Sequence, residues 1–92
     1  MSKIAAETRA IQCLAWLAQN EELLPVFLGS TGASIDDLKA RAGEADFLGS
    51  VLDFLMMDDA WVVEVCDAHG WAYPELAAAR AQLPGGEAVH WT

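Results

Sequence analysis

The segment between Phe47 and Leu55 constrains the fold of this chain more than any other part of the sequence. Plotted at about 100° per residue, its apolar side chains cover a helical stripe roughly 160° wide. The stripe consists of Phe47, Leu48, Val51, Leu52, Phe54 and Leu55. Neighbouring elements must contact such a helix from several sides to bury it. The segment is therefore predicted to be the central helix of a domain.

Capping residues, prolines and glycines divide the rest of the chain into further short helices. Ser, Asn and Asp side chains accept hydrogen bonds from the unpaired N–H groups of a first turn, and glycine readily takes the left-handed conformation that ends a helix. The predicted starts are Ser2, Asn20 with a restart near Pro25, Ser34 with Asp37, Asp58 or Asp59, and Pro74. The predicted stops are Gly32, Gly43, Gly70 and the run 84–86.

These signals predict an all-α fold, a compact orthogonal bundle of five to six short helices in residues 1–86, followed by a tail at 87–92. The tail contains Trp91. The core-facing stripe predicted for the first helix, from Ser2 to Ala18, is Ile4, Ile11, Leu14, Ala15 and Ala18. In the short helix after Ser34, Ile35 and Leu38 are predicted to face inward.

The charge of the chain narrows the classes of partner. The 92 residues carry a net charge of −9, and residues 42–92 contain nine acidic residues but one basic residue, Arg80. A negative surface repels phosphate, which disfavours nucleic acids and anionic bilayers, and no apolar run approaches the ~20 residues that span a membrane. A protein with a basic surface, or no partner, fits better. Self-association as a homodimer is a separate expectation.

Metal binding and nucleophilic catalysis find little support in the sequence. Cys66 and His69 are three residues apart on one predicted helical face, but a structural zinc site needs four ligands, and Cys13 and His90 are far away in the sequence. We expect no catalytic residue, metal or cofactor, with Cys66 in the core and His69 bonded to a carbonyl in the last turn of its helix. Two reduced, buried thiols fit a cytoplasmic location.

The aromatic residues suggest an interaction surface. Trp71 and Tyr73 lie in the connection between the last two predicted helices, where they either cover the core or serve as exposed anchors for a partner. With Asp58 and Asp59 they form the candidate surface of a non-catalytic protein–protein interaction module. The alternative is a small-molecule or lipid binder, with an inter-helix pocket lined by Phe54, Met56, Met57 and Trp61.

Several short motifs resemble a small alphaproteobacterial family of all-helical proteins described as a domain of unknown function. The likeness covers roughly residues 10–83. The motifs are Leu14–Ala18, Phe27–Leu28, Thr31–Gly32, Phe47–Leu48, Val51–Leu55, Asp58–Asp59, Pro74 and Leu83. The resemblance implies a helical bacterial cytoplasmic protein and supplies no activity, substrate or site.

Overall fold

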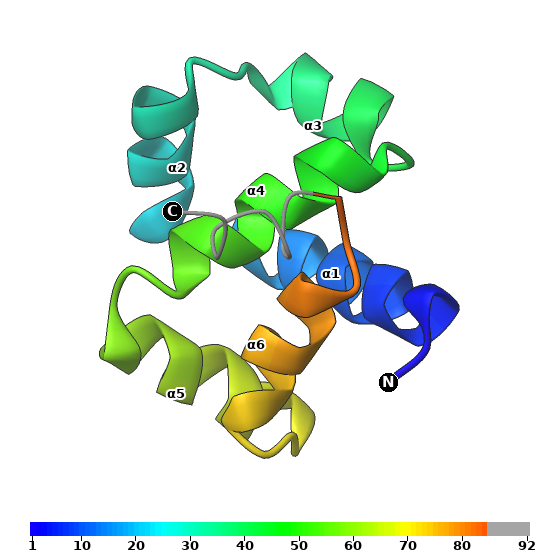
Figure 1. Cartoon of the computed structure of the whole chain (residues 1–92). Helices are drawn as coiled ribbons and strands as arrows, with labels where there is room; N and C mark the ends of the chain where they lie inside the picture. The colour runs from blue at the N-terminus through cyan, green and yellow to red at the C-terminus, as the bar shows by residue number, and fades with distance from the viewer. Residues whose placement is uncertain (85–92) are drawn as a thin grey trace, which may run out of the picture.

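Six helices make up the part of the chain that the computed structural model describes, residues 1–84 (Figure 1). They are α1 (Lys3–Ala18), α2 (Leu23–Thr31), α3 (Ile35–Arg41), α4 (Ala45–Leu55), α5 (Asp59–His69) and α6 (Pro74–Ala81). No strand occurs within residues 1–84, so the predicted all-α bundle is confirmed. The predicted tail and Trp91 lie outside the described residues. None of these six helices is long and apolar enough to cross a membrane.

Helix α4 is the centre of the bundle, as its apolar stripe predicts. It runs through the middle of the molecule with α1 behind it, and it packs against α1, α5 and α6 (Figure 1). All six predicted core residues of α4 are buried. Phe27 of α2 is also fully buried, and its ring meets Phe47 and Phe54 edge-on, with centroids 6.1 and 5.2 Å away. These edge-to-face contacts fix α2 against α4.

The predicted caps are present at the helix starts. The Ser2 hydroxyl and the Asp58 carboxylate each accept a hydrogen bond from the first turn of their helices. Ser34 and Asp37 form a reciprocal capping box, in which each side chain accepts from the other residue's backbone N–H. Asp thus replaces the usual Glu or Gln of this motif without loss of either bond.

Helix α2 begins two residues before the predicted restart at Pro25. Asn20 Oδ1 accepts from the N–H groups of Glu22 and Leu23, at 3.0 Å each, and this starts the helix early. Pro25 then stands at the third helical position. The N–H group that proline lacks has no intrahelical acceptor there, so the helix continues undisturbed.

Glycines end two helices as predicted, and α3 ends two residues before the third predicted stop, at Gly43. Gly32 and Gly70 follow α2 and α5 with φ of 73°. Helix α3 instead ends at Arg41, and Gly43 has no positive φ. The chain leaves α3 through a turn in which the Glu44 N–H donates to the Arg41 carbonyl at 2.9 Å, so no left-handed residue is needed.

The face of α1 predicted to be buried is mostly exposed. Ile4 and Ile11 are 77% and 46% exposed, and Ala15 and Ala18 also face solvent, which leaves Leu14 as the predicted member that is buried. The buried residues of α1 are Ala6, Ala10, Cys13, Leu14 and Leu17. Both α4 and α6 pack closely on α1, and small side chains on the inner face allow that approach. The inner face of α1 thus combines two leucines with three small side chains.

Helix α3 shows the same kind of departure on a smaller scale. Leu38 is buried as predicted, but Ile35 is 54% exposed. Ile35 is the first residue of a seven-residue helix, so it lies at the rim of the bundle and has no neighbour on its outer side. One buried leucine anchors α3.

Arg80 joins α6 to α4 at a glycine. Its guanidinium lies against Gly49, donates from Nε and Nη2 to the two carboxylate oxygens of Asp53 at 2.6 and 3.1 Å, and donates from Nη1 to the Pro84 carbonyl at 2.9 Å. A Cβ at Gly49 would lie 2.9 Å from Nη1. A methyl group at this position would therefore require the Arg80 guanidinium to move.

Candidate functional site

The outer face of α5 carries exposed acidic and apolar side chains. Asp59, Val63 and Asp67 recur every fourth residue and therefore lie in one row. All three are exposed, and Glu64 is exposed beside them. Within residues 1–84 none of these carboxylates takes part in a salt bridge. We call this row, with Tyr73 at its end, the α5 face.

Tyr73 extends the α5 face beyond the end of the helix. The side chain is 48% exposed, and its hydroxyl donates to Asp67 Oδ1 at 3.0 Å. This hydrogen bond and the negative charge of Asp67 raise the pKa of the Tyr73 hydroxyl, so the phenol stays neutral well into the alkaline range. The bond holds an aromatic ring in place at the surface.

Trp71 takes a different role from Tyr73. Its ring lies between two other groups, stacked on the His69 ring at 4.2 Å on one side and under the Arg9 guanidinium at 4.6 Å on the other. Arg9 also pairs with Glu75, with Nη1 and Oε2 3.0 Å apart. Trp71 is half-buried and packs against the core, so it mainly fastens the connection between α5 and α6 onto α1.

The four residues of the predicted surface are therefore placed at the two ends of α5. Asp58 and Asp59 stand at its start, and Trp71 and Tyr73 follow its end. The Asp58 carboxylate is occupied as the helix cap, whereas Asp59 and Tyr73 are exposed. The sequence analysis did not identify Val63 and Asp67, which lie between Asp59 and Tyr73. The successive spacing of four residues from Asp59 to Val63 and from Val63 to Asp67 could have indicated them.

The two cysteines are buried thiols. Both are free and fully buried. Burial raises the pKa of Cys13 to about 12, and burial together with Glu75 and Asp67 raises that of Cys66. A thiol with a raised pKa is protonated at neutral pH and is a poor nucleophile, so neither side chain suits covalent catalysis.

His69 bonds to its own helix, as predicted. Its Nδ1 lies 2.7 Å from the Val65 carbonyl oxygen, and the carbonyl accepts the proton. Cys66 Sγ lies 3.9 Å from the Ala72 carbonyl oxygen. Within residues 1–84, no group of three or more His, Cys, Asp or Glu side chains is placed to hold a metal ion, and His90 lies outside that part.

The four residues predicted to line an apolar pocket pack on each other, on the core or face solvent. The Phe54 and Trp61 rings stack with centroids 4.9 Å apart, so each covers the other. Met57 is 76% exposed, and Met56 packs partly on the core. None of these four residues lines the cavity described next.

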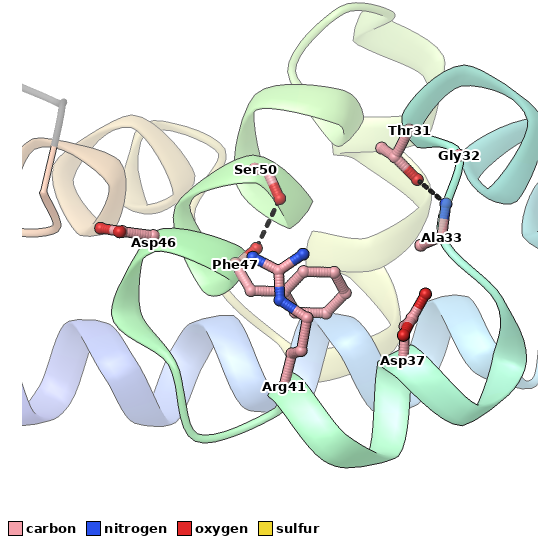
Figure 2. A pocket seen from close by; sticks show the side chains of 8 residues that line it. All are labelled: Thr31, Gly32, Ala33, Asp37, Arg41, Asp46, Phe47 and Ser50. Atoms are coloured by element: carbon pink, nitrogen blue, oxygen red, sulfur yellow. Dashed lines mark hydrogen bonds between the residues drawn. The ribbon is translucent and has the colours of Figure 1, made fainter.

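A cavity of about 420 Å³ opens where the end of α2, helix α3 and the start of α4 meet (Figure 2). Its lining residues are Thr31, Gly32, Ala33, Asp37, Arg41, Asp46, Phe47 and Ser50. The Arg41 guanidinium lies over the Phe47 ring, 4.8 Å from its centroid, while its Nε donates to Glu44 at 3.1 Å. Figure 2 shows Asp37 on the α3 side facing Thr31 and Ala33.

The chemistry of this cavity is polar and of mixed charge. Arg41 supplies donors, Asp37 and Asp46 supply acceptors, and Phe47 is the single aromatic ring of the lining. Such a lining suits a small polar group rather than a lipid chain. No pattern in the sequence indicates this cavity, because Thr31–Gly32 has the features of a helix stop, and α2 meets α4 only through tertiary packing.

Comparison with known proteins assigns the chain to a family and leaves its activity open. No curated protein and no solved structure matches the chain significantly. One family model matches residues 3–86, nearly the whole chain and all six helices. The predicted resemblance to a helical family of unknown function is thereby confirmed. The chain belongs to the family described as protein of unknown function, DUF3572.

Proposed function

We propose that this protein is a non-catalytic interaction module that binds a protein with a basic surface through the α5 face. The observation that carries the proposal is the row Asp59, Val63 and Asp67, ending at Tyr73 and exposed along the whole helix. Its carboxylates are in no salt bridge with a base of residues 1–84. Lysines or arginines of a partner would supply the missing positive charges.

Tyr73 gives this surface an anchor as well as charge. Aromatic side chains are enriched at the energetic centres of protein interfaces, and a ring held by a hydrogen bond loses little freedom on binding. The Asp67 contact supplies that restraint. Val63, 36% exposed, adds an apolar contact between the charges. Acidic groups around an anchor favour fast, salt-dependent binding of basic partners.

The proposal includes a location in a bacterial cytoplasm. Cys13 and Cys66 are both buried and unpaired, which is the usual state of cysteines in a reducing compartment. The net charge of −9 also argues against nucleic acid as the partner, because phosphates would be repelled.

A charge-reversal pair tests the α5 face. Asp59→Lys places a positive charge on it, and Asp36→Lys is the matched control, since both residues are exposed and lie in the first turn of a helix. Tyr73→Ala is the second test variant. Each is used as bait in a native bacterial lysate at low salt and at about 0.5 M salt, where exposed charges are strongly screened.

The expected result is a protein captured at low salt by the wild type and by Asp36→Lys, and lost with Asp59→Lys and with Tyr73→Ala. Its loss at high salt would agree with a charged interface. Equal capture by all four baits would contradict the proposal, as would no specific capture by the wild type.

The cavity between α2, α3 and α4 supports a second candidate function, the binding of a small polar molecule. Its volume of about 420 Å³ falls within the range of small-molecule sites. Ligand-detected NMR with small carboxylates, amines and amino acids tests it. Binding that disappears in Asp46→Asn but persists in Asp36→Asn would support this function, and binding of no member of the panel would contradict it.

A further inference from the structure

The exposed side of α1 carries an ordered row of isoleucine, alanine and threonine side chains. Five residues recur at alternating spacings of four and three, and all five face solvent. They are Ile4, Thr8, Ile11, Ala15 and Ala18, which we call the α1 outer stripe. The two isoleucines are 77% and 46% exposed. The large apolar side chains of this stripe thus lie outside, and the alanines Ala6 and Ala10 lie inside.

This spacing is the one by which two helices pack along a common seam. Apolar residues at alternating intervals of four and three keep one stripe facing a partner helix over several turns. Helix α1 has 16 residues, which gives a seam about 24 Å long. The surface therefore suits another helix of similar length, and α1 of a second copy carries the same pattern.

Side-chain sizes along the stripe match under a twofold axis at Ile11. In an antiparallel pair centred there, Ile4 of one copy faces Ala18 of the other, and Thr8 faces Ala15. Ile11 of each copy meets Ile11 of the other on the axis, and each Ile4 meets an alanine, so the two ends of the seam have the same width. A parallel pair would place Ile4 on Ile4 at one end and Ala18 on Ala18 at the other, and the helices would diverge.

Charge at the ends of α1 selects the same orientation. Lys3 stands at the start of the helix, and Glu21 and Glu22 follow its end; all three are exposed and in no salt bridge within residues 1–84. An antiparallel pair brings the Lys3 end of each α1 near the end of the other α1 that Glu21 and Glu22 follow. A parallel pair places like charges together at both ends, which is unfavourable.

We propose that a second copy of this chain covers the α1 outer stripe, with the two α1 helices antiparallel across a twofold axis near Ile11. A single-helix seam is small for a protein interface. The dimer is therefore expected to dissociate in the micromolar range. This interface is separate from the α5 face, so the two proposals succeed or fail independently.

Sedimentation of the full chain across a concentration series tests the dimer, with circular dichroism to verify folding. Ile11→Glu places two negative charges on the axis and is expected to weaken association at least ~100-fold. Ile35→Glu is the matched control, because Ile35 is an exposed isoleucine at 54% on another helix. Ala15→Glu repeats the test at a second position of the stripe.

Cysteine crosslinking tests the orientation, since Cys13 and Cys66 are buried. A mixture of Ile4→Cys and Ala18→Cys chains is expected to give the mixed disulfide in preference to either self-pair. Weaker association in Lys3→Glu, restored by adding Glu21→Lys and Glu22→Lys, would support the same orientation. A monomer at all concentrations, a dimer unaffected by Ile11→Glu and Ala15→Glu, or self-pairing of Ile4→Cys would each overturn the proposal.

Discussion

Replacing Gly49 with alanine tests whether Arg80 controls the packing of α6 on α4. In an open helix, glycine to alanine stabilises by roughly 0.5–1 kcal/mol. At Gly49 the new methyl group would lie 2.9 Å from Arg80 Nη1 and 3.1 Å from Cζ. The guanidinium cannot yield easily, because Asp53 and the Pro84 carbonyl hold it and its side chain is 15% exposed.

The magnitude follows from two opposing effects. Overpacking of one methyl group in a fixed environment costs about 1–3 kcal/mol, which exceeds the gain in helix propensity. We expect Gly49→Ala to lower the free energy of unfolding by about 1–2 kcal/mol. For a domain of this size the midpoint of thermal unfolding should fall by roughly 4–16 °C. Circular dichroism during heating measures it.

The chain provides a matched control and a rescue. Gly29 lies in α2, and no atom lies within 4 Å of the position that a methyl group would take there, so Gly29→Ala should stabilise by roughly 0.5–1 kcal/mol. Removing the obstruction with Arg80→Ala should make Gly49→Ala stabilising in that background. If Gly49→Ala alone stabilised as much as Gly29→Ala, the Arg80 contact would not constrain the packing of α6 on α4.

Three further predictions concern single residues. In the folded protein the Cys13 thiol has a pKa of about 12, against 9.0 for an ordinary thiol. The buried, protonated thiol therefore contributes to the stability of the fold in full below about pH 9, and this contribution is lost as the pH rises towards 12. Urea unfolding should show stability falling by up to ~1.4 kcal/mol per pH unit there, and Cys13→Ala should flatten the slope. Asp58→Ala removes the cap of α5 and should cost about 1 kcal/mol, with faster amide exchange in the first turn; unchanged exchange would contradict the capping role. Trp71→Ala should destabilise by about 2–3 kcal/mol in chemical unfolding because both ring faces are covered, whereas exposed Tyr73→Ala should cost under about 1 kcal/mol; equal losses would mean that Tyr73 serves folding.

Local signals predicted the ends of the helices well. Ser2, Ser34 and Asp58 cap helices where the sequence places caps, and Gly32 and Gly70 end helices in the left-handed conformation. Each of these effects depends on a few neighbouring residues. Hydrogen bonding to the first or last turn is complete within that stretch, so no knowledge of the tertiary fold is needed.

The orientation of α1 was not predictable from the same kind of pattern. A hydrophobic stripe gives most weight to large side chains, which made Ile4 and Ile11 the expected inner residues. The structure places Ala6 and Ala10 inside, because α4 and α6 approach α1 closely. That requirement comes from helices far away in the sequence, and only their arrangement reveals it.

The candidate surface was predictable at its ends and not along its length. Asp59 and Tyr73 are exposed, as an interaction surface requires, but Trp71 is used to hold the connection against α1. Its partner Arg9 belongs to the first helix of the chain, so the contact had no local signal. The cavity at Arg41 and Phe47 was missed for the same reason, since it exists where three helices meet.

The exposed isoleucines of α1 have a consequence for the stability of a single copy of the chain. Ile4 and Ile11 are 77% and 46% exposed, so much of their apolar surface is in contact with water before and after folding. Ile4→Ser and Ile11→Ser should therefore change the free energy of unfolding by under about 1 kcal/mol each.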